Sequence, residues 1–194
     1  MRSFSWVPFS LLCLILTCVI ICAGQSEDGV RGHVFRSDAL RLTYTFSEKL
    51  APMVESEMPP TFRSDPNGRE DLILALWDTP ERTGTPRMAF LYDKNVRQAG
   101  LSRAQMADNY LNAIKQMWVS VPGVKIVGPK QISPAGYSIW RLDLRQPDDR
   151  PHYNSAVVIP LADRRLLVIR VSAPSQSELD TEVDSLSALH FDRK

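Results

Sequence analysis

Apolar and polar residues alternate along several short stretches of the chain. In 40–46, Leu, Tyr and Phe at even positions are separated by Arg and Thr at odd positions, which is typical of a half-buried strand. Residues 72–77 are an apolar run bounded by charge, which favours a strand covered on both faces. The same reasoning predicts further strands at 87–92, 125–127, 137–145, 155–160 and 165–172.

Two stretches have helical periodicity. Ser102 and Gln105 match a capping box, and an apolar stripe at spacings of 4, 4 and 3 follows them: Met106, Tyr110, Ile114 and Met117. Pro122-Gly123 ends this helix. Ser177 is the expected cap of a last helix that has Leu179, Val183 and Leu186 on one side. A short helix, interrupted by Pro52, is also expected within 47–57.

Short connections between the strands, such as the expected hairpin turn at 161–164, favour a mostly antiparallel sheet. Each amphipathic helix needs a sheet face to cover. The predicted fold class is therefore α+β, a mostly antiparallel sheet with amphipathic helices packed on it, with room for one helix on each face. We expect one domain over 37–194, preceded by a flexible lead-in at 25–36 that is polar and contains two glycines.

Residues 1–24 resemble a signal peptide. Arg2 gives a short positive start, and Leu11–Ala23 is an uncharged apolar run of 13 residues. A membrane-spanning helix needs about 20 apolar residues, so this run has the length of a signal core. Such a leader would direct export to a periplasmic or extracellular space and would be removed by cleavage near Gly24. The alternative is a retained leader that tethers an envelope component to the membrane.

Cysteine and charge narrow the possible functions. The three cysteines, Cys13, Cys18 and Cys22, all lie in the leader, so the mature chain has no disulfide, no cysteine nucleophile and no thiolate metal site. The chain has 23 Lys and Arg against 22 Asp and Glu, which argues against nucleic acid as a partner.

Four segments carry a resemblance to a known family: LRLTYTFSEKL, GLSRAQMADNYLNAIKQM, AGYSIWRLDL and RRLLVIRVSAPSQSELDTEVDSLSALHF. Over 37–192 their layout resembles the exported or lumenal PsbP-like proteins and their Mog and DcrB relatives, which share an α-β-α sandwich. The resemblance implies an accessory, assembly or binding role without enzymatic chemistry. It implies no cofactor and supplies no catalytic residue.

One dense polar cluster could ligate a divalent metal. Asp148, Asp149 and His152 place two carboxylates and an imidazole within five residues, and such groups are ligands for divalent ions. The spacing matches no established metal motif. The alternative is a solvated hairpin loop stiffened by Pro147 and Pro151.

Ser155 follows His152 by three residues, so a metal-assisted or Ser-dependent hydrolase that uses the 148–155 loop is an alternative function. A hydrolase of the common elbow type carries a G-x-S-x-G motif, which the sequence lacks.

Three arginines on predicted strands are candidate ligand-binding residues. Arg141 and Arg145 alternate on one strand face, and Arg170 lies on a strand that we expect nearby. An arginine cluster on a sheet can bind a carboxylate or a phosphate. The alternative is a water-facing charge ladder, because Asp143 already offers these arginines a partner.

These observations favour an exported, non-enzymatic accessory or binding protein. We expect it to act through a sheet surface or groove on a protein partner or a small ligand, without a cofactor.

Overall fold

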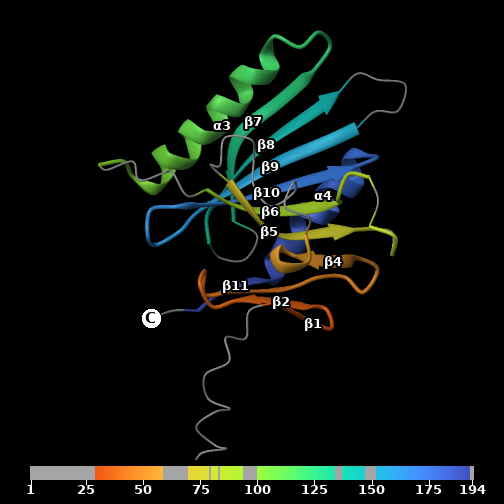
Figure 1. The fold of residues 1–194 in the computed structure, drawn as a ribbon. Coiled ribbons are helices and arrows are strands. Elements are labelled where there is room, and N and C mark those ends of the chain that lie inside the picture. The colour runs from red at the N-terminus through yellow and green to blue at the C-terminus, as the bar shows by residue number, and fades with distance from the viewer. Residues whose placement is uncertain are drawn as a thin grey trace, which may run out of the picture.

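The computed structural model describes residues 29–58, 70–78, 80–82, 84–93, 100–133, 137–146 and 152–192. A seven-stranded sheet, in which every neighbouring pair is antiparallel, forms the middle layer (Figure 1). In spatial order its strands are β4 (Ala51–Val54), β5 (Glu70–Trp77), β6 (Met88–Asp93), β10 (Leu166–Ala173), β9 (His152–Pro160), β8 (Ile139–Gln146) and β7 (Lys125–Ile132).

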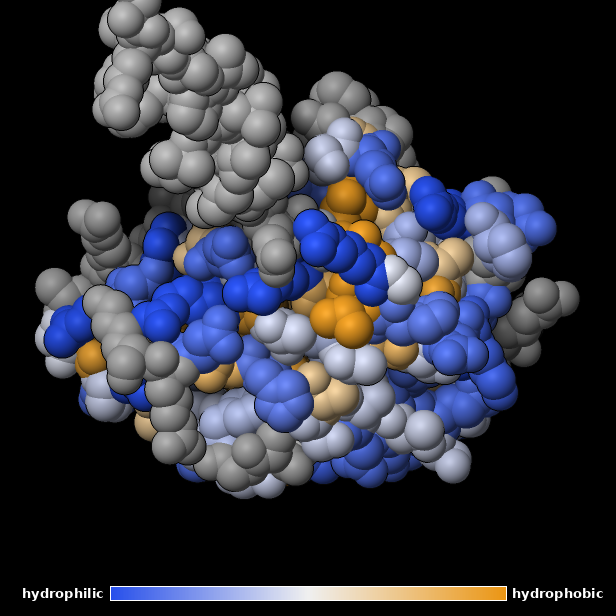
Figure 2. Space-filling view, turned by 90° about the horizontal axis from the view of Figure 1, so that it is seen from below, coloured by the Kyte–Doolittle hydropathy of each residue, from blue (hydrophilic) through white to orange (hydrophobic). Residues whose placement is uncertain are grey.

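A second, four-stranded antiparallel sheet joins the two ends of the described chain. Its order is β1 (Gly29–Arg31), β2 (Val34–Ser37), β3 (Leu42–Thr45) and β11 (Leu189–Phe191). Figure 2 shows the molecule from below, the side where this sheet lies in Figure 1. Hydrophilic side chains cover most of this side, and hydrophobic ones gather in a limited central area.

The helices α3 (Arg103–Val119) and α4 (Gln176–Ser185) pack on opposite faces of the large sheet. Strand β10 shows this division because Leu166 and Val168 belong to the α3-side core, whereas Leu167 and Ile169 belong to the α4-side core. The predicted fold class, α+β with a mostly antiparallel sheet between helices, is thus confirmed. The separate small sheet, which lies on the α4 side, was not predicted.

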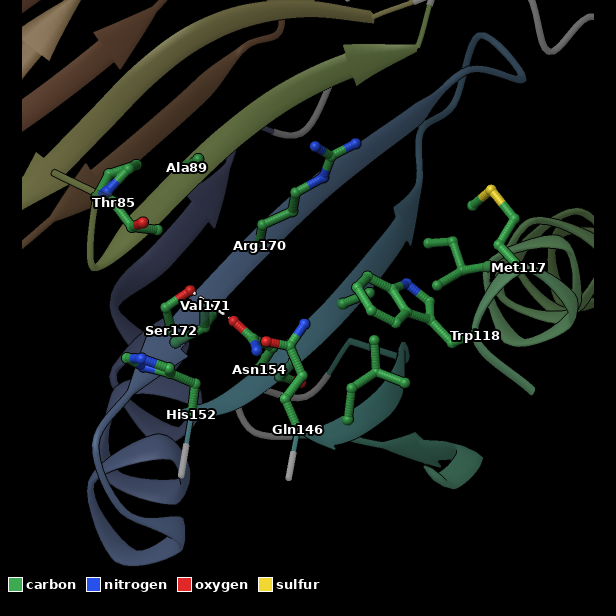
Figure 3. Close-up of a pocket in the computed structure, with 15 residues that line it drawn as sticks. Thr85, Ala89, Met117, Trp118, Gln146, His152, Asn154, Arg170, Val171 and Ser172 are labelled. Atoms are coloured by element: carbon green, nitrogen blue, oxygen red, sulfur yellow. Dashed lines mark hydrogen bonds between the residues drawn. The ribbon is translucent and has the colours of Figure 1, made fainter. Parts of the chain in front are cut away.

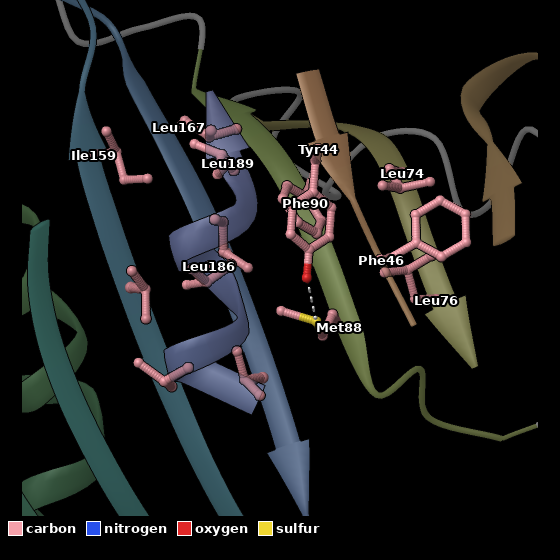
Figure 4. Close-up of a cluster of buried hydrophobic side chains, with 14 of the residues drawn as sticks. Tyr44, Phe46, Leu74, Leu76, Met88, Phe90, Ile159, Leu167, Leu186 and Leu189 are labelled. Carbon is pink, nitrogen blue, oxygen red and sulfur yellow. Dashed lines mark hydrogen bonds between the residues drawn. The ribbon is translucent and has the colours of Figure 1, made fainter. Parts of the chain in front are cut away.

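The α4-side core is built around Tyr44 and Phe90 (Figure 4). Their ring centroids are 5.0 Å apart, and both side chains are fully buried. The Tyr44 hydroxyl lies 3.6 Å from Met88 Sδ and 3.1 Å from Ser185 Oγ. Burial raises the pKa of Tyr44 to about 12, so the hydroxyl stays protonated and joins the small sheet to α4 through a neutral hydrogen bond.

The lead-in predicted at 25–36 is wrong over its described part. Residues 29–31 and 34–37 form the β1–β2 hairpin, and β2 pairs with β3. Phe35 is only 4% exposed, so this segment contributes to the core. Its high content of polar residues reflects the outer face of an edge sheet rather than an unpaired chain.

Two local predictions also fail. The helix expected within 47–57 is strand β4 followed by a single 3₁₀ turn, Glu55–Glu57, because pairing of 51–54 with β5 overrides a weak local helical preference. The last helix is capped by Ser175, whose side chain accepts from the Glu178 amide, instead of by Ser177. The apolar face of that helix is as predicted, since Leu179, Val183 and Leu186 are fully buried.

Other turns and caps agree with the sequence. The capping box of α3 is complete, with Gln105 N donating to Ser102 Oγ and Ser102 N donating to Gln105 Oε1. The hairpin between β9 and β10 closes through Leu161 N donating to Arg165 O at 2.8 Å. Among the described residues, neither helix has the length and apolar character that crossing a bilayer requires.

A bulge in the edge strand β7 depends on Gly128. Its φ is +104°, a conformation that L side chains rarely adopt, and a Cβ there would lie 2.8 Å from the Arg141 carbonyl oxygen and 3.2 Å from Lys130 N. We expect Gly128→Ala to lower the free energy of unfolding by about 2 kcal/mol or more, because backbone strain and a backbone clash add. Urea denaturation measures this loss.

Gly100→Ala is the matched control. Gly100 also has a positive φ, +89°, but a Cβ there meets nothing within 4 Å. Gly100→Ala should lower the free energy of unfolding by only about 1 kcal/mol, because it adds backbone strain without a clash. Equal losses in the two variants would contradict the close packing of β7 on β8.

Candidate functional site

Helix α3 covers only part of its sheet face. It contacts β7, β8 and β9, and the neighbouring strands β10 and β6 extend beyond it (Figure 1). The space beside its C-terminal half is a cavity of about 670 Å³, which we call the α3 groove (Figure 3). Its lining comes from α3, from four strands and from the segment before β6: Thr85, Pro86, Ala89, Ile114, Met117, Trp118, Leu144, Gln146, His152, Asn154, Ser155, Ala156, Arg170, Val171 and Ser172.

The helix side of the α3 groove is apolar. Ile114 and Trp118 are half-buried, one helical turn apart, and Met117 beside them is 66% exposed. In Figure 3, Trp118 and Met117 stand on the helix side, opposite the strands. Leu144 and Ala156 extend this apolar surface across the sheet. An exposed Met at the end of an apolar wall is a flexible surface that adapts to the shape of a ligand.

The other part of the α3 groove is polar. Ser172 Oγ donates to Asn154 Oδ1 at 2.8 Å, and Gln146 and His152 lie on the same side (Figure 3). The Asn154 amide nitrogen has no partner within the part of the chain that the structure describes. An apolar pocket with a few polar groups gathered at one place is the usual form of a small-molecule site.

Arg170 is positioned by a buried carboxylate. Its Nη2 donates to Glu70 Oε2 at 2.7 Å, and the Tyr110 hydroxyl of α3 donates to Glu70 Oε1. Glu70 is 6% exposed, and burial together with its negative charge raises the pKa of Tyr110. Tyr110 therefore remains a hydrogen-bond donor at neutral pH, and both Glu70 oxygens are satisfied.

The three predicted ligand-binding arginines do not form one cluster. Arg170 lies on the α3 side of the sheet, whereas Arg141 and Arg145 lie on the α4 side. Arg141 is buried between Asp143, at 2.7 Å from its Nε, and Asp180 of α4. The predicted pairing with Asp143 is confirmed, but these two residues are not water-facing, because α4 covers them.

The guanidinium of Arg145 lies over the Tyr153 ring, 5.3 Å from its centroid. This contact is on the α4 side, because Tyr153 packs against that core. Of the three predicted arginines, Arg170 alone lines the α3 groove.

The ion cluster under α4, formed by Arg141, Asp143 and Asp180, shifts the pKa values of Arg141 and Asp180. Burial tends to lower the pKa of Arg141, but its hydrogen bonds to Asp143 and Asp180 outweigh burial and raise it. Burial tends to raise the pKa of Asp180, but hydrogen bonds from Arg141 and Gln176 outweigh burial and lower it. Both shifts favour the charged pair, so the cluster fastens α4 to the sheet.

Of the three predicted metal ligands, the structure describes the position of His152. Asp148 and Asp149 lie outside the described residues. His152 is the exposed first residue of β9 and lines the α3 groove. Within the described ranges, no three His, Cys, Asp or Glu residues are grouped as a metal site requires. Metal binding by these three residues stays a prediction.

The hydrolase alternative used a 148–155 loop, but His152–Ser155 belong to strand β9. Because side chains alternate along a strand, His152 lies with Asn154 and Ala156 on the α3 side, and Ser155 lies with Val157 on the α4 side. Ser155 is 2% exposed, and its Oγ has no hydrogen-bond partner among the described residues. The strand therefore separates the proposed nucleophile from the proposed base.

Sequence reasoning missed several residues of this site. Tyr110, Ile114 and Trp118 recur at a spacing of four, so the pattern could have placed Trp118 on the covered stripe in place of Met117. Glu70 and Ser172 carry no sequence signal, because their roles come from the strand order, in which β10 lies between β9 and β6 and β5 follows β6.

No protein-family model and no curated protein sequence matches this chain. Among solved structures, the chain is similar to cyanobacterial PsbP (CyanoP) from Synechocystis sp. PCC 6803, at 10% identity, over 88% of this chain and 99% of that chain, with a TM-score of 0.45. It is also similar to LpqN of Mycobacterium tuberculosis, described as involved in cell envelope biogenesis, at 16% identity, over 82% of each chain, with a TM-score of 0.36.

The comparison agrees with the PsbP-like resemblance expected from the sequence. At these identities and TM-scores, neither protein's role carries over to this chain. The α3 groove is therefore interpreted from its own residues.

The Arg141–Asp180 contact predicts a pH-dependent stability. Because folding lowers the pKa of Asp180 below its ordinary 3.8, this carboxylate stabilises the fold above that pH, and the effect is lost as the pH falls through the folded value. We expect Asp180→Asn to cost about 0.5–1 kcal/mol at pH 7, since the Asp180 side chain is half exposed. Thermal unfolding from pH 7 down to pH 2 measures the difference from wild type.

The matched control is Asp184→Asn, an exposed position on the same helix. Its difference from wild type should stay small across the pH range. A loss in Asp180→Asn that persists unchanged at pH 2 would contradict the ionic origin of the effect.

Proposed function

We propose that this protein is an exported, non-enzymatic binding protein that holds a small, largely apolar molecule in the α3 groove. The observation that carries this proposal is the groove itself. Its volume of about 670 Å³ lies within the range of about 300–1,000 Å³ that is common for small-molecule sites. Its apolar wall on α3 and its polar groups on the sheet suit a ligand with an apolar body and a polar end.

A binding role fits this geometry better than the hydrolase alternative. The Ser155 and His152 side chains lie on different faces of β9, so they cannot exchange a proton directly. Two polar groups of the α3 groove are also held in place, Asn154 by Ser172 and Arg170 by Glu70, which lies outside the lining. Fixed donors and acceptors of this kind orient a ligand.

The test of this function is uptake of the neutral apolar fluorophore N-phenyl-1-naphthylamine, followed by its emission. We expect emission to rise with wild type and to rise much less with Ala89→Phe, because Ala89 is a half-buried residue of the cavity lining and a phenyl group there fills part of the space. The matched control is Val34→Phe, which adds the same ring at a 37% exposed position on the small sheet.

Equal uptake by Ala89→Phe and Val34→Phe would place the fluorophore elsewhere and contradict the proposal. An absence of uptake by folded wild-type protein would contradict it as well.

Export after removal of the leader is part of the same proposal. Residues 1–24 lie outside the described residues, so the support comes from the short apolar run and the small residues that follow it. We expect the intact mass of the protein recovered from the exported fraction to lack residues 1–24. A full-length mass found in the membrane fraction would favour the tethered alternative.

A further inference from the structure

We propose that the ligand of the α3 groove carries an anionic acid head, a carboxylate or a phosphate, and that Arg170 binds this head. The inference rests on the proposed function and adds the chemical class of the ligand. In this arrangement the head lies beside the Arg170 guanidinium, and the apolar body lies along Trp118 and Ile114.

The charge of the lining selects against a cationic ligand. None of the fifteen lining residues is an Asp or a Glu. A cation placed there would lose water without gaining a counter-charge in the lining, which is costly. Arg170 is the one arginine among these residues, so the lining favours an anionic head over a cationic one.

Arg170 has unused hydrogen-bonding capacity. A guanidinium has five N–H donors, and the hydrogen bond to Glu70 uses one of them, on Nη2. The Arg170 side chain is 56% exposed, whereas its partner carboxylate is only 8% exposed. Glu70 therefore holds Arg170 while more than half of the Arg170 side chain stays exposed, and a carboxylate or phosphate can accept two of the remaining N–H groups.

The anchoring of Arg170 reduces the entropy lost on binding. Glu70 is itself fixed by the Tyr110 hydroxyl, so α3 and two strands determine where the guanidinium lies. A long side chain that is already ordered loses less freedom when it binds a ligand.

The neighbouring strand β9 leaves space beside Arg170. In the antiparallel register, Ala156 is opposite Arg170, and Asn154 is opposite Ser172. Arg170 and Asn154 are thus diagonal neighbours on the α3 side, about 7–8 Å apart at the backbone. The Arg170 guanidinium points along β10 away from Asn154 (Figure 3), so Asn154 does not share the head group with it. The small Ala156 side chain opposite Arg170 leaves room on the sheet for the ligand.

Arg141 and Arg145 offer no comparable site. Arg141 is buried and paired with two carboxylates under α4, and Arg145 lies over Tyr153 on the other face of the sheet. Arg145→Gln therefore removes the same charge from the molecule without touching the α3 groove, which makes it the control for long-range electrostatics.

The experiment compares decanoate, decyl phosphate and neutral decanol by isothermal titration calorimetry, each below its aggregation limit. We expect both acids to bind wild type about tenfold more tightly than decanol, the effect of one or two charge-assisted hydrogen bonds. Arg170→Gln should bring the acids down to the affinity of decanol and leave decanol unchanged. A preference for one acid over the other in wild type distinguishes a carboxylate head from a phosphate head.

Glu70→Gln separates a specific effect on Arg170 from unfolding, because an unfolded variant could not bind the acids more tightly than wild type. The amide still accepts from Tyr110, but it no longer neutralises Arg170. We expect the gain in free positive charge to outweigh the lost anchoring, so the acids should bind more tightly than to wild type and decanol should not. Arg145→Gln should leave all affinities within about twofold of wild type, because screening weakens an exposed charge at this distance.

The outcomes separate the two proposals. Binding of all three compounds with equal affinity would overturn the acid head and leave the apolar groove intact. Failure of all three to bind folded wild-type protein would overturn the proposed function itself. Loss of acid binding in Arg145→Gln to the same extent as in Arg170→Gln would show a general charge effect and overturn the role of Arg170.

Discussion

Burial of strand β10 on both faces is the constraint on which the rest of the structure depends. Leu166 and Val168 pack under α3, while Leu167, Ile169 and Val171 pack under α4 and the small sheet. A strand with two apolar faces must lie inside a layered structure, so helices are needed on both sides. Residues 25–194 contain no cysteine, so no disulfide within them can replace these contacts.

The α3 groove exists because the two faces of the seven-stranded sheet are covered to different extents. On one face, α4 and the four-stranded sheet together bury the strands, including the charged pair Arg141–Asp143. On the other face α3 lies over β7, β8 and β9, and its last turns stand beside β10. Arg170 is the charged exception to the apolar pattern of β10, and it occurs where the helix stops covering the sheet.

The sequence predicted what depends on local pattern. Period-two alternation located β3 and β8, and the Ser102 box located the start of α3. It could not predict the β1–β2 hairpin or the pairing of β2 with β3, because that hairpin is a short polar edge whose buried apolar residue is Phe35. It placed Arg141, Arg145 and Arg170 together because alternation gives a side within one strand, whereas the shared face of two strands depends on their register.

The most direct test of the central claim is an experimental structure of the protein with decanoate bound. The account predicts the alkyl chain beside Trp118 and the carboxylate within hydrogen-bonding distance of the Arg170 guanidinium, with Glu70 still in contact with Tyr110. A decanoate molecule bound on the α4 side or on the small sheet, with the α3 groove filled only by water, would contradict it.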